Sequence, residues 1–259
     1  MTATLERSTS VLHTPAVSLD GVHKTFGTGP SAVTALRDID LSVAPGEFVC
    51  LLGASGCGKS TLLNLVAGLD EPTSGSVAVR TSRPSVMFQE AALLPWLTAG
   101  RNVELPLRLA GAGRRERRER AAELLELVRL SGQADKRPHE LSGGMRQRVA
   151  LARSLAAATS SADSGTPGLL LMDEPFAALD AITRDVLQGE LLRVWRATGI
   201  SILFVTHDVR EAVRVAQRVV LLSSRPGTVV REWTVGDDRE RLHEEITGRL
   251  REVITSHAA

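Results

Sequence analysis

The sequence predicts an α/β fold built on a mostly parallel sheet. Four short apolar runs, at residues 48–52, 169–172, 202–205 and 219–222, have the length and composition of strands covered on both faces. Helical stretches separate them, and strands that alternate with helices form parallel sheets. A glycine-rich stretch, GASGCGKST at residues 53–61, directly follows the first run. A strand, a glycine loop and a helix in that order indicate a phosphate-binding site.

Composition limits the classes of protein that remain. Of the 259 residues, 43% are hydrophobic and 24% are charged, which allows a buried core and excludes a disordered chain. The net charge of +1 gives no argument for a nucleic-acid partner. The two cysteines, Cys50 and Cys57, form no disulfide framework, so a reducing compartment is indicated.

The ends of the chain carry no sign of export or membrane insertion. The first residues lack the apolar core of a signal peptide, and no apolar run reaches the roughly 18 residues of a membrane span. We expect a disordered tail over residues 1–14 and a single domain over residues 15–259. A cytoplasmic location follows from these expectations.

The elements before and after the glycine loop differ in their periodicity. Residues 16–26 and 35–43 alternate apolar and polar side chains, which predicts half-buried strands ahead of the turn at Pro45-Gly46. Residues 61–69 have helical spacing and stop near Gly68. Two further strand candidates follow at residues 75–79 and 84–88.

Residues of about 90–158 predict a helical subdomain inserted into the α/β domain. Residues 114–130 place five apolar side chains on one helix face, and residues 143–157 form a second helix. The run Arg114–Arg120 is typical of a solvated helix face with Arg/Glu pairs, which we favour over an RNA or membrane patch.

Two segments in the second half of the chain lie outside the predicted sheet. The Ala-, Ser-, Thr- and Gly-rich residues 156–168 predict a flexible surface loop. Residues of about 238–255 predict an amphipathic C-terminal helix.

The glycine loop fits the pattern G-x-x-x-x-G-K-[ST] through Gly53, Gly58, Lys59 and Ser60. Glycines let successive N–H groups turn toward an anion, and the following helix adds its positive dipole end. Lys59 would reach the β- and γ-phosphates, Ser60 would ligate Mg²⁺ and Thr61 would bond the α-phosphate.

The loop residues between the glycines and the lysine would bind through their backbone. They are Ala54, Ser55, Gly56 and Cys57. Cys57 has two interpretations, a redox sensor or a small residue that contributes backbone alone, and we favour the second.

Acidic residues and a histidine follow two later strands. Asp173 and Glu174 end the run at 169–172, at the sheet edge where ligands bind in open α/β sheets. Asp173 could hold Mg²⁺ through a water, and Glu174 could polarise the attacking water. His207, after the run at 202–205, could bond the γ-phosphate and orient that water. The alternatives are an acidic pair that caps the next helix and a solvated histidine.

A second anion-binding helix start is expected at Ser142, Gly143 and Gly144, although a serine and two glycines are usually only a cap and a turn. One nucleotide cannot easily use two helix starts on different subdomains. A head-to-tail dimer, with each nucleotide between the two copies, resolves this difficulty.

In their order, these motifs resemble the ATP-binding subunit of an ATP-binding cassette (ABC) transporter over roughly residues 16–225. The stretch 53–61 is similar to the Walker A motif, 169–175 to Walker B and 141–145 to the signature, with Met145 where Gln is common. The resemblance implies further roles. Gln89 would touch Mg²⁺ and sense the membrane partner, Asp180 would contact the opposite subunit and Phe26 would stack on adenine.

The resemblance also implies partners. They are ATP and Mg²⁺, a second copy of the chain, an integral membrane permease and, indirectly, an extracytoplasmic solute-binding protein, with the chain peripheral at the cytoplasmic face of the membrane. Residues 88–98 and 141–156 look most like importers of nitrate, sulfonate or taurine. The permease would dock near Leu94, Trp96 and Leu97, unless Trp96 packs inside the helical subdomain. An exporter ATPase, or an ABC ATPase acting on nucleic acid or the ribosome, remains as an alternative.

Overall fold

The structure is a computed structural model that describes residues 14–81, 84–162 and 168–258. Its centre is a six-stranded sheet in the order β5-β6-β7-β3-β8-β9. The strands are β3 (Phe48–Leu52), β5 (Ser85–Met87), β6 (Leu169–Asp173), β7 (Ser201–Thr206), β8 (Arg218–Leu222) and β9 (Val229–Thr234). All neighbours pair in parallel except β8 and β9. The predicted mostly parallel α/β fold is therefore confirmed.

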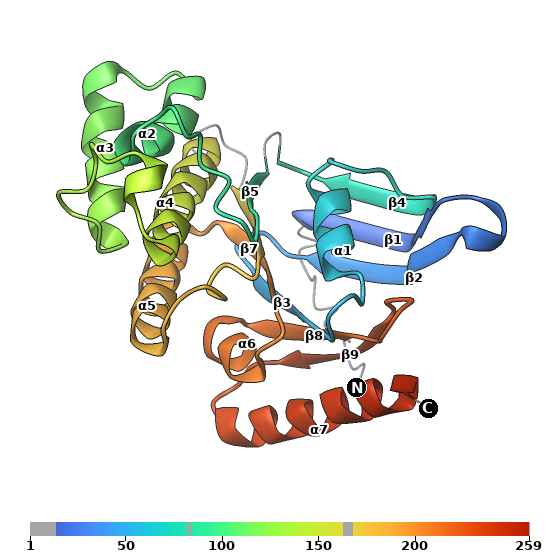
Figure 1. Ribbon diagram of the computed structural model, residues 1–259. Helices are drawn as coiled ribbons and strands as arrows, with labels where there is room; N and C mark the ends of the chain where they lie inside the picture. Colours follow the sequence, from blue (N-terminus) through green and yellow to red (C-terminus); the bar gives the residue numbers. More distant parts are fainter. Residues whose placement is uncertain (1–13, 82–83, 163–167, 259) are drawn as a thin grey trace, which may run out of the picture.

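A smaller antiparallel sheet precedes the phosphate loop, in the order β2-β1-β4. It consists of β1 (Val17–Phe26), β2 (Val33–Val43) and β4 (Ser74–Val79). Helix α1 (Lys59–Val66) lies against strands of both sheets (Figure 1). The predicted N-terminal antiparallel strands are confirmed, and α1 is the element that joins the two sheets.

The central sheet is apolar on both faces, as its continuous hydrophobic strands require. In β3, Phe48, Cys50 and Leu52 face a core shared with most of the helices. Val49 and Leu51 face the opposite core, which contains α1 and the antiparallel sheet. All five side chains are fully buried. Each apolar residue buried in this way contributes about 1.5–3 kcal/mol, so the strand is fixed in register.

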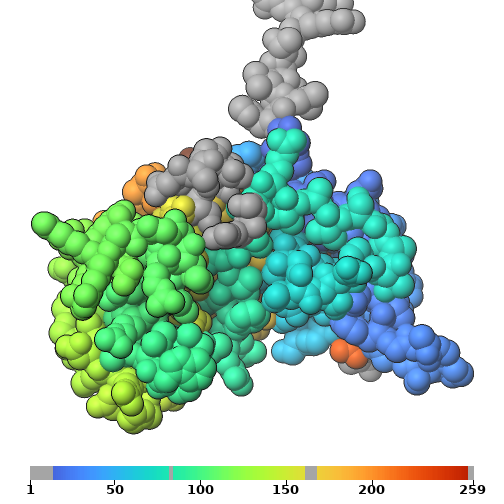
Figure 2. Space-filling view, turned by 90° about the horizontal axis from the view of Figure 1, so that it is seen from above, coloured from blue at the N-terminus to red at the C-terminus, as the bar shows by residue number. Residues whose placement is uncertain are grey.

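A group of helices forms one end of the molecule. It contains α2 (Ala99–Leu109), α3 (Arg114–Leu127) and α4 (Gly143–Ala162), which pack on one another. In the space-filling view, the green helical end and the blue antiparallel strands lie at opposite ends of the molecule (Figure 2). Arg/Glu pairs were expected from spacing on the helix that begins at Arg114, and two of them form on α3, Arg115–Glu119 and Arg120–Glu123.

The flexible loop predicted at residues 156–168 is wrong in its first half, because α4 continues to Ala162. Ala156 and Ala158 are fully buried, so they pack rather than face solvent. The hydroxyls of Thr159 and Ser160 donate to the carbonyls of Leu155 and Ala156, at 2.8 and 2.6 Å. These bonds satisfy the polar side chains within the helix. Residues 163–167 lie outside the described residues, as do residues 1–13 of the expected tail.

The remaining helices are α5 (Ala181–Thr198), α6 (Val209–Val215) and α7 (Arg239–Ala258). The predicted C-terminal helix thus corresponds to α7, which packs against α6 (Figure 1). Within the described part of the chain, no helix combines the length and the apolar character needed to cross a bilayer.

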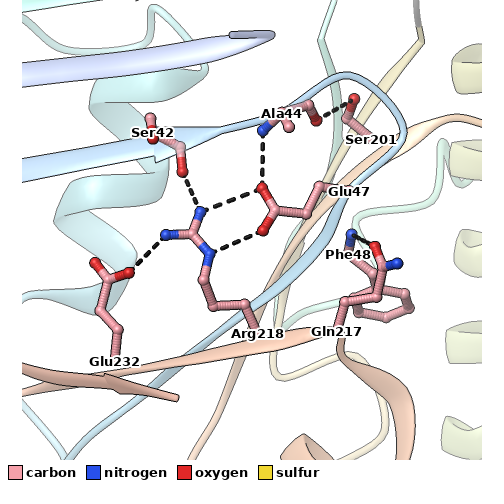
Figure 3. A network of polar contacts seen from close by, with 8 residues as sticks. All are labelled: Ser42, Ala44, Glu47, Phe48, Ser201, Gln217, Arg218 and Glu232. Carbon is pink, nitrogen blue, oxygen red and sulfur yellow. Dashed lines mark hydrogen bonds and ion pairs between the residues drawn. The ribbon is translucent and has the colours of Figure 1, made fainter. Parts of the chain in front are cut away.

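A polar network ties the two sheets together around Arg218 (Figure 3). Its guanidinium donates to both carboxylate oxygens of Glu47, at 2.8 and 3.2 Å, and to Glu232 at 2.6 Å. It also donates to the carbonyl of Ser42 in β2. Burial opposes the charge of Arg218, but the bonds to Glu47 and Glu232 outweigh burial and raise its pKa. The network joins β2 to β8 and β9.

Arg218→Met is expected to lower the free energy of unfolding by about 2–3 kcal/mol, because Glu47 would stay largely buried without its partner. Arg218 and Glu47 are each only 19% exposed. The control is Arg193→Met, whose pair with Glu190 leaves the arginine 66% exposed and should contribute less than about 1 kcal/mol. Urea unfolding measures the free energy of unfolding of both variants. Equal losses of stability would contradict a special role for the network.

Candidate functional site

The sheet topology gathers the predicted motifs at one edge. Strands β6, β7 and β3 are neighbours and run in parallel, so their carboxyl ends meet. The phosphate loop follows β3, Asp173 ends β6 with Glu174 next to it, and His207 follows β7. Residues distant in the sequence are therefore brought together by strand order alone.

The phosphate loop is held in a shape that requires glycine at Gly58. This residue has φ of 99°, in the left-handed region, and an added Cβ would lie 2.7 Å from Cδ2 of Leu36. Lys59 is only 6% exposed. Its ammonium donates to the carbonyls of Gly53 and Ala54, both at 2.8 Å. The lysine charge is thus fixed inside the loop.

Cys57 is buried within the same loop, with 1% of its surface exposed. Burial raises the pKa of its thiol, although the nearby Lys59 acts in the opposite direction. A buried thiol with a raised pKa is a poor nucleophile. The structure therefore favours the interpretation of Cys57 as a small residue that contributes backbone, and disfavours the redox sensor.

A cavity of about 340 Å³ opens over the loop. Predicted residues from four segments line it, namely Phe26, Ser55, Gly56, Gly58, Lys59, Ser60, Thr61, Gln89, Asp173 and Glu174. Sequence reasoning missed three other lining residues, Val33, Ala35 and Arg225. A larger hollow of about 610 Å³ between α2, α3 and α4 contains none of the motif residues. We therefore take the smaller cavity as the functional one.

Phe26 lines this cavity together with the phosphate loop, although the two are distant from each other in the sequence. Its side chain is 45% exposed, and the ammonium of Lys24 lies 4.9 Å from the centre of its ring. An exposed aromatic face beside a phosphate site suits the stacking of a base. The position fits the role predicted for Phe26.

Asp173 and Ser60 form the part of the site suited to a metal. Burial raises the pKa of Asp173, an effect that the neighbouring Ser60 hydroxyl only partly opposes. Among the described residues, no three His, Cys, Asp or Glu side chains cluster as a metal cage. Paired oxygen donors without a full cage fit Mg²⁺ that is shared with phosphates.

Glu174 and His207 meet at the same edge. Nδ1 of His207 lies 3.2 Å from Oε1 of Glu174. Glu174 has φ of 45°, which is unusual for a residue other than glycine, and its N–H donates to the carbonyl of Val205 at 3.0 Å. Backbone strain of this kind persists where the surrounding structure fixes it, often at functional sites. The carboxylate is therefore positioned by both its backbone and its neighbour.

A buried network that sequence reasoning missed supports the strand end before His207. Thr206 donates to the carboxylate of Glu211, which also accepts from the amide of Gln188 at 2.9 Å. The backbone N–H of Asp208 donates to the hydroxyl of Thr206 at 3.1 Å. Three polar side chains are involved, all at most 7% exposed. A Glu on a helix gives no local signal that it will be buried, so only the fold reveals this support.

The buried Glu211 gives a pH dependence that can be measured. Burial raises its pKa, so the native state binds the proton more tightly than the unfolded chain does. Stability should therefore fall as the pH rises from the usual range of a glutamate through the raised pKa. We expect Glu211→Gln to remove this loss and to gain on the order of 1 kcal/mol over the wild type at high pH.

Urea unfolding of the wild type and of Glu211→Gln between pH 5 and pH 8 measures this difference. The control is Glu123→Gln, since the Glu123 side chain is 63% exposed. A constant difference between wild type and Glu211→Gln across this range would contradict the expectation.

The signature residues lie away from the cavity of their own chain. Ser142 and Gly143 are exposed at the start of α4, and Ser142 accepts the N–H of Met145 at 3.2 Å. Asp180 caps α5, accepts the N–H of Thr183 at 2.9 Å and has its pKa lowered by that bond. None of Ser142, Gly143, Gly144 and Asp180 lines the described cavity. These residues are therefore available for contacts with a second copy of the chain.

Comparisons with known proteins agree on one family. The family described as ABC transporter matches residues 36–177. A taurine import ATP-binding protein, TauB of Burkholderia pseudomallei, is 47% identical over 85% of this chain and 84% of its own. A nitrate import ATP-binding protein, NrtD of Synechocystis, is 46% identical over 85% of this chain and 82% of its own.

A solved structure shows the same fold. It is a dimeric post-hydrolysis state of the ATP-binding cassette MJ0796 bound to ADP and phosphate. The TM-score is 0.75 at 36% identity, over 85% of this chain and 99% of that one.

Proposed function

The chain belongs to the ABC transporter family and is an ATPase, and we propose that it powers the import of a small anion such as nitrate, a sulfonate or taurine. The observation that carries the ATP-hydrolysing role is the cavity in which Lys59, Ser60, Asp173 and Glu174 converge at one sheet edge. The named relatives are importers of taurine and nitrate. No residue of an ATP-binding subunit need touch the solute, so the solute class comes from the relatives alone.

Different residues of the site contribute to different parts of ATP binding and hydrolysis. Phe26 stacks on adenine, while the loop amides of residues 53–61 and Lys59 hold the phosphates. Ser60, Asp173 and Gln89 would hold Mg²⁺, which neutralises phosphate charge when bound. Glu174 takes a proton from the water that attacks the γ-phosphorus, and ADP leaves as the bond to its β-phosphate oxygen breaks.

His207 keeps the base in place. Its Nδ1 is within 3.2 Å of the Glu174 carboxylate, so a Nδ1–H would donate to it. His207 is also 60% exposed, which leaves Nε2 open toward a phosphate. Its role is to orient Glu174 and, through Glu174, the attacking water.

A second copy of the chain completes the site. The exposed Ser142 and Gly143 at the start of α4 offer a hydroxyl and N–H groups to the γ-phosphate held by the partner's loop. Asp180 would contact the opposite copy close by. Dimeric structures of the related cassette support this arrangement. Loss of the γ-phosphate would remove the bridge between the copies, so that they separate.

The surface proposed for the permease is the segment Leu94–Thr98. Trp96 is 67% exposed, so it does not pack inside the helical group. The buried Asn102 holds this segment with its amide, which donates to the carbonyls of Leu94, Leu97 and Thr98 at 3.0–3.3 Å. Gln147 of α4 donates to the carbonyl of Gln89 at 3.3 Å. A fixed segment with an exposed tryptophan near Gln89 suits a partner that must respond to the nucleotide.

We propose that the chain acts at the cytoplasmic face of a membrane, bound to a permease and working with an extracytoplasmic solute-binding protein. The test is to purify the tagged chain from its native host in mild detergent and to identify what accompanies it. We expect a polytopic permease. A permease without any solute-binding protein would favour an exporter. Ribosomes or DNA-repair proteins in its place would overturn the transport function and leave the ATPase.

A further inference from the structure

We propose that Arg225 is a nucleotide-binding residue whose guanidinium contacts the phosphate chain of ATP. It lies in the turn between β8 and β9 and lines the cavity together with the phosphate loop. The inference rests on the proposed function as an ATPase and adds a second cation to its nucleotide site.

The charges around the cavity leave a place for this cation. Of the described residues that line it, Lys59 and Arg225 are the two with positive charge, and Asp173 and Glu174 carry negative charge. ATP brings several further negative charges. Lys59 is buried against loop carbonyls, whereas Arg225 is exposed. Its side chain makes no hydrogen bond or ion pair with another described residue, so its donors are available to a ligand.

The guanidinium is within reach of the phosphate loop. Nη2 of Arg225 lies 3.8 Å from the position that a Cβ would take on Gly56. Gly56 has φ of 76° and stands in the middle of the loop. A side chain there would fill the space between the loop backbone and Arg225. The planar fork of an arginine suits phosphate oxygens, which it can bind through two parallel N–H donors.

The backbone that carries Arg225 is fixed against the same loop. The N–H of Gly227 donates to the carbonyl of Ala35 at 2.8 Å, and its carbonyl accepts the N–H of Arg37 at 2.9 Å. An added Cβ on Gly227 would lie 2.2 Å from the carbonyl oxygen of Cys57. The turn therefore packs directly on the backbone of the phosphate loop.

Two serines of the turn hold its backbone in place, one through bonds within the turn and one through a bond to the C-terminal helix. Ser223 donates to the carbonyl of Pro226 and accepts the N–H of Thr228, both at 2.8 Å. Ser224 donates to the carbonyl of Val253 in α7 at 3.4 Å. A side chain on a fixed backbone has less freedom to lose on binding. The turn that carries Arg225 is thus fixed beside the phosphate loop.

The experiment measures how ATP, ADP and adenosine displace a fluorescent ATP analogue from the full chain. Arg225→Ala should weaken the binding of ATP and ADP about fivefold to tenfold and leave the affinity for adenosine unchanged, because only the phosphates lose a partner. Arg225→Lys keeps the charge without the fork and should lose less. The control is Arg196→Ala, since Arg196 is exposed on α5 outside the cavity.

The outcomes separate the inference from the proposed function. Unchanged ATP affinity in Arg225→Ala, or an equal loss for adenosine, would overturn the role of Arg225, because the second result reports a change of cavity shape. A wild-type chain with no affinity for ATP would overturn both. Higher salt should also weaken ATP binding less in Arg225→Ala than in Arg196→Ala.

Discussion

Glu174→Gln is expected to lower the rate of ATP hydrolysis at least about 100-fold while ATP binding is retained. The amide has the size of the carboxylate but cannot accept the proton of the attacking water. Because hydrolysis would no longer remove the γ-phosphate, the ATP-bound dimer should accumulate. Phosphate release measures the rate, and size-exclusion chromatography with ATP and Mg²⁺ measures the dimer.

The matched control for this variant is Glu123→Gln, an exposed glutamate on α3 that is remote from the cavity. It should hydrolyse ATP at the wild-type rate. Near-normal turnover by Glu174→Gln would show that another group accepts the proton. His207→Ala should lie between the two, because Glu174 loses its neighbour at 3.2 Å but keeps its backbone position.

Lys59→Ala is expected to weaken ATP binding by on the order of 100-fold, since charge-assisted bonds to phosphate are among the stronger ones in proteins. Two effects combine in this loss. The phosphates lose a cation, and the loop loses the bonds at 2.8 Å that tie the ammonium to the carbonyls of Gly53 and Ala54. The fluorescent ATP analogue measures the affinity, and urea unfolding shows how far the loop bonds contribute to stability.

Lys136→Ala is the control, because the Lys136 side chain is exposed and lies outside the cavity. Its affinity for ATP should equal that of the wild type. Lys59→Arg should also bind poorly, since a side chain only 6% exposed leaves little room for the larger guanidinium. Tight ATP binding by Lys59→Ala would contradict the phosphate role of this lysine.

The elements that sequence analysis predicted well are those with a strong local pattern. The apolar runs that became β3, β6, β7 and β8 are continuous because both faces of the sheet are covered. Strand β9 was not predicted, because it is a half-exposed antiparallel edge with weaker patterning. The loop expected from 156–162 is helical, because packing against the core outweighs a composition that favours loops.

The residues of the candidate site also fall into two groups, those in a local sequence motif and those outside one. Lys59, Asp173, Glu174 and His207 stand in short motifs with a fixed place after a strand, so their spacing alone predicted one edge. Arg225 and Glu211 stand in no such motif. Arg225 reaches the cavity because its turn packs on the phosphate loop, and Glu211 is buried because α6 packs beside β7.

The sequence by itself determined the type of sheet, the phosphate loop and the candidate site residues, because each depends on neighbours within a few positions. Only the tertiary structure decided which strands are adjacent, how Glu174 meets His207 and which side chains from distant segments complete the cavity. Strand order and the packing of turns on one another depend on the whole chain, and no local pattern records them.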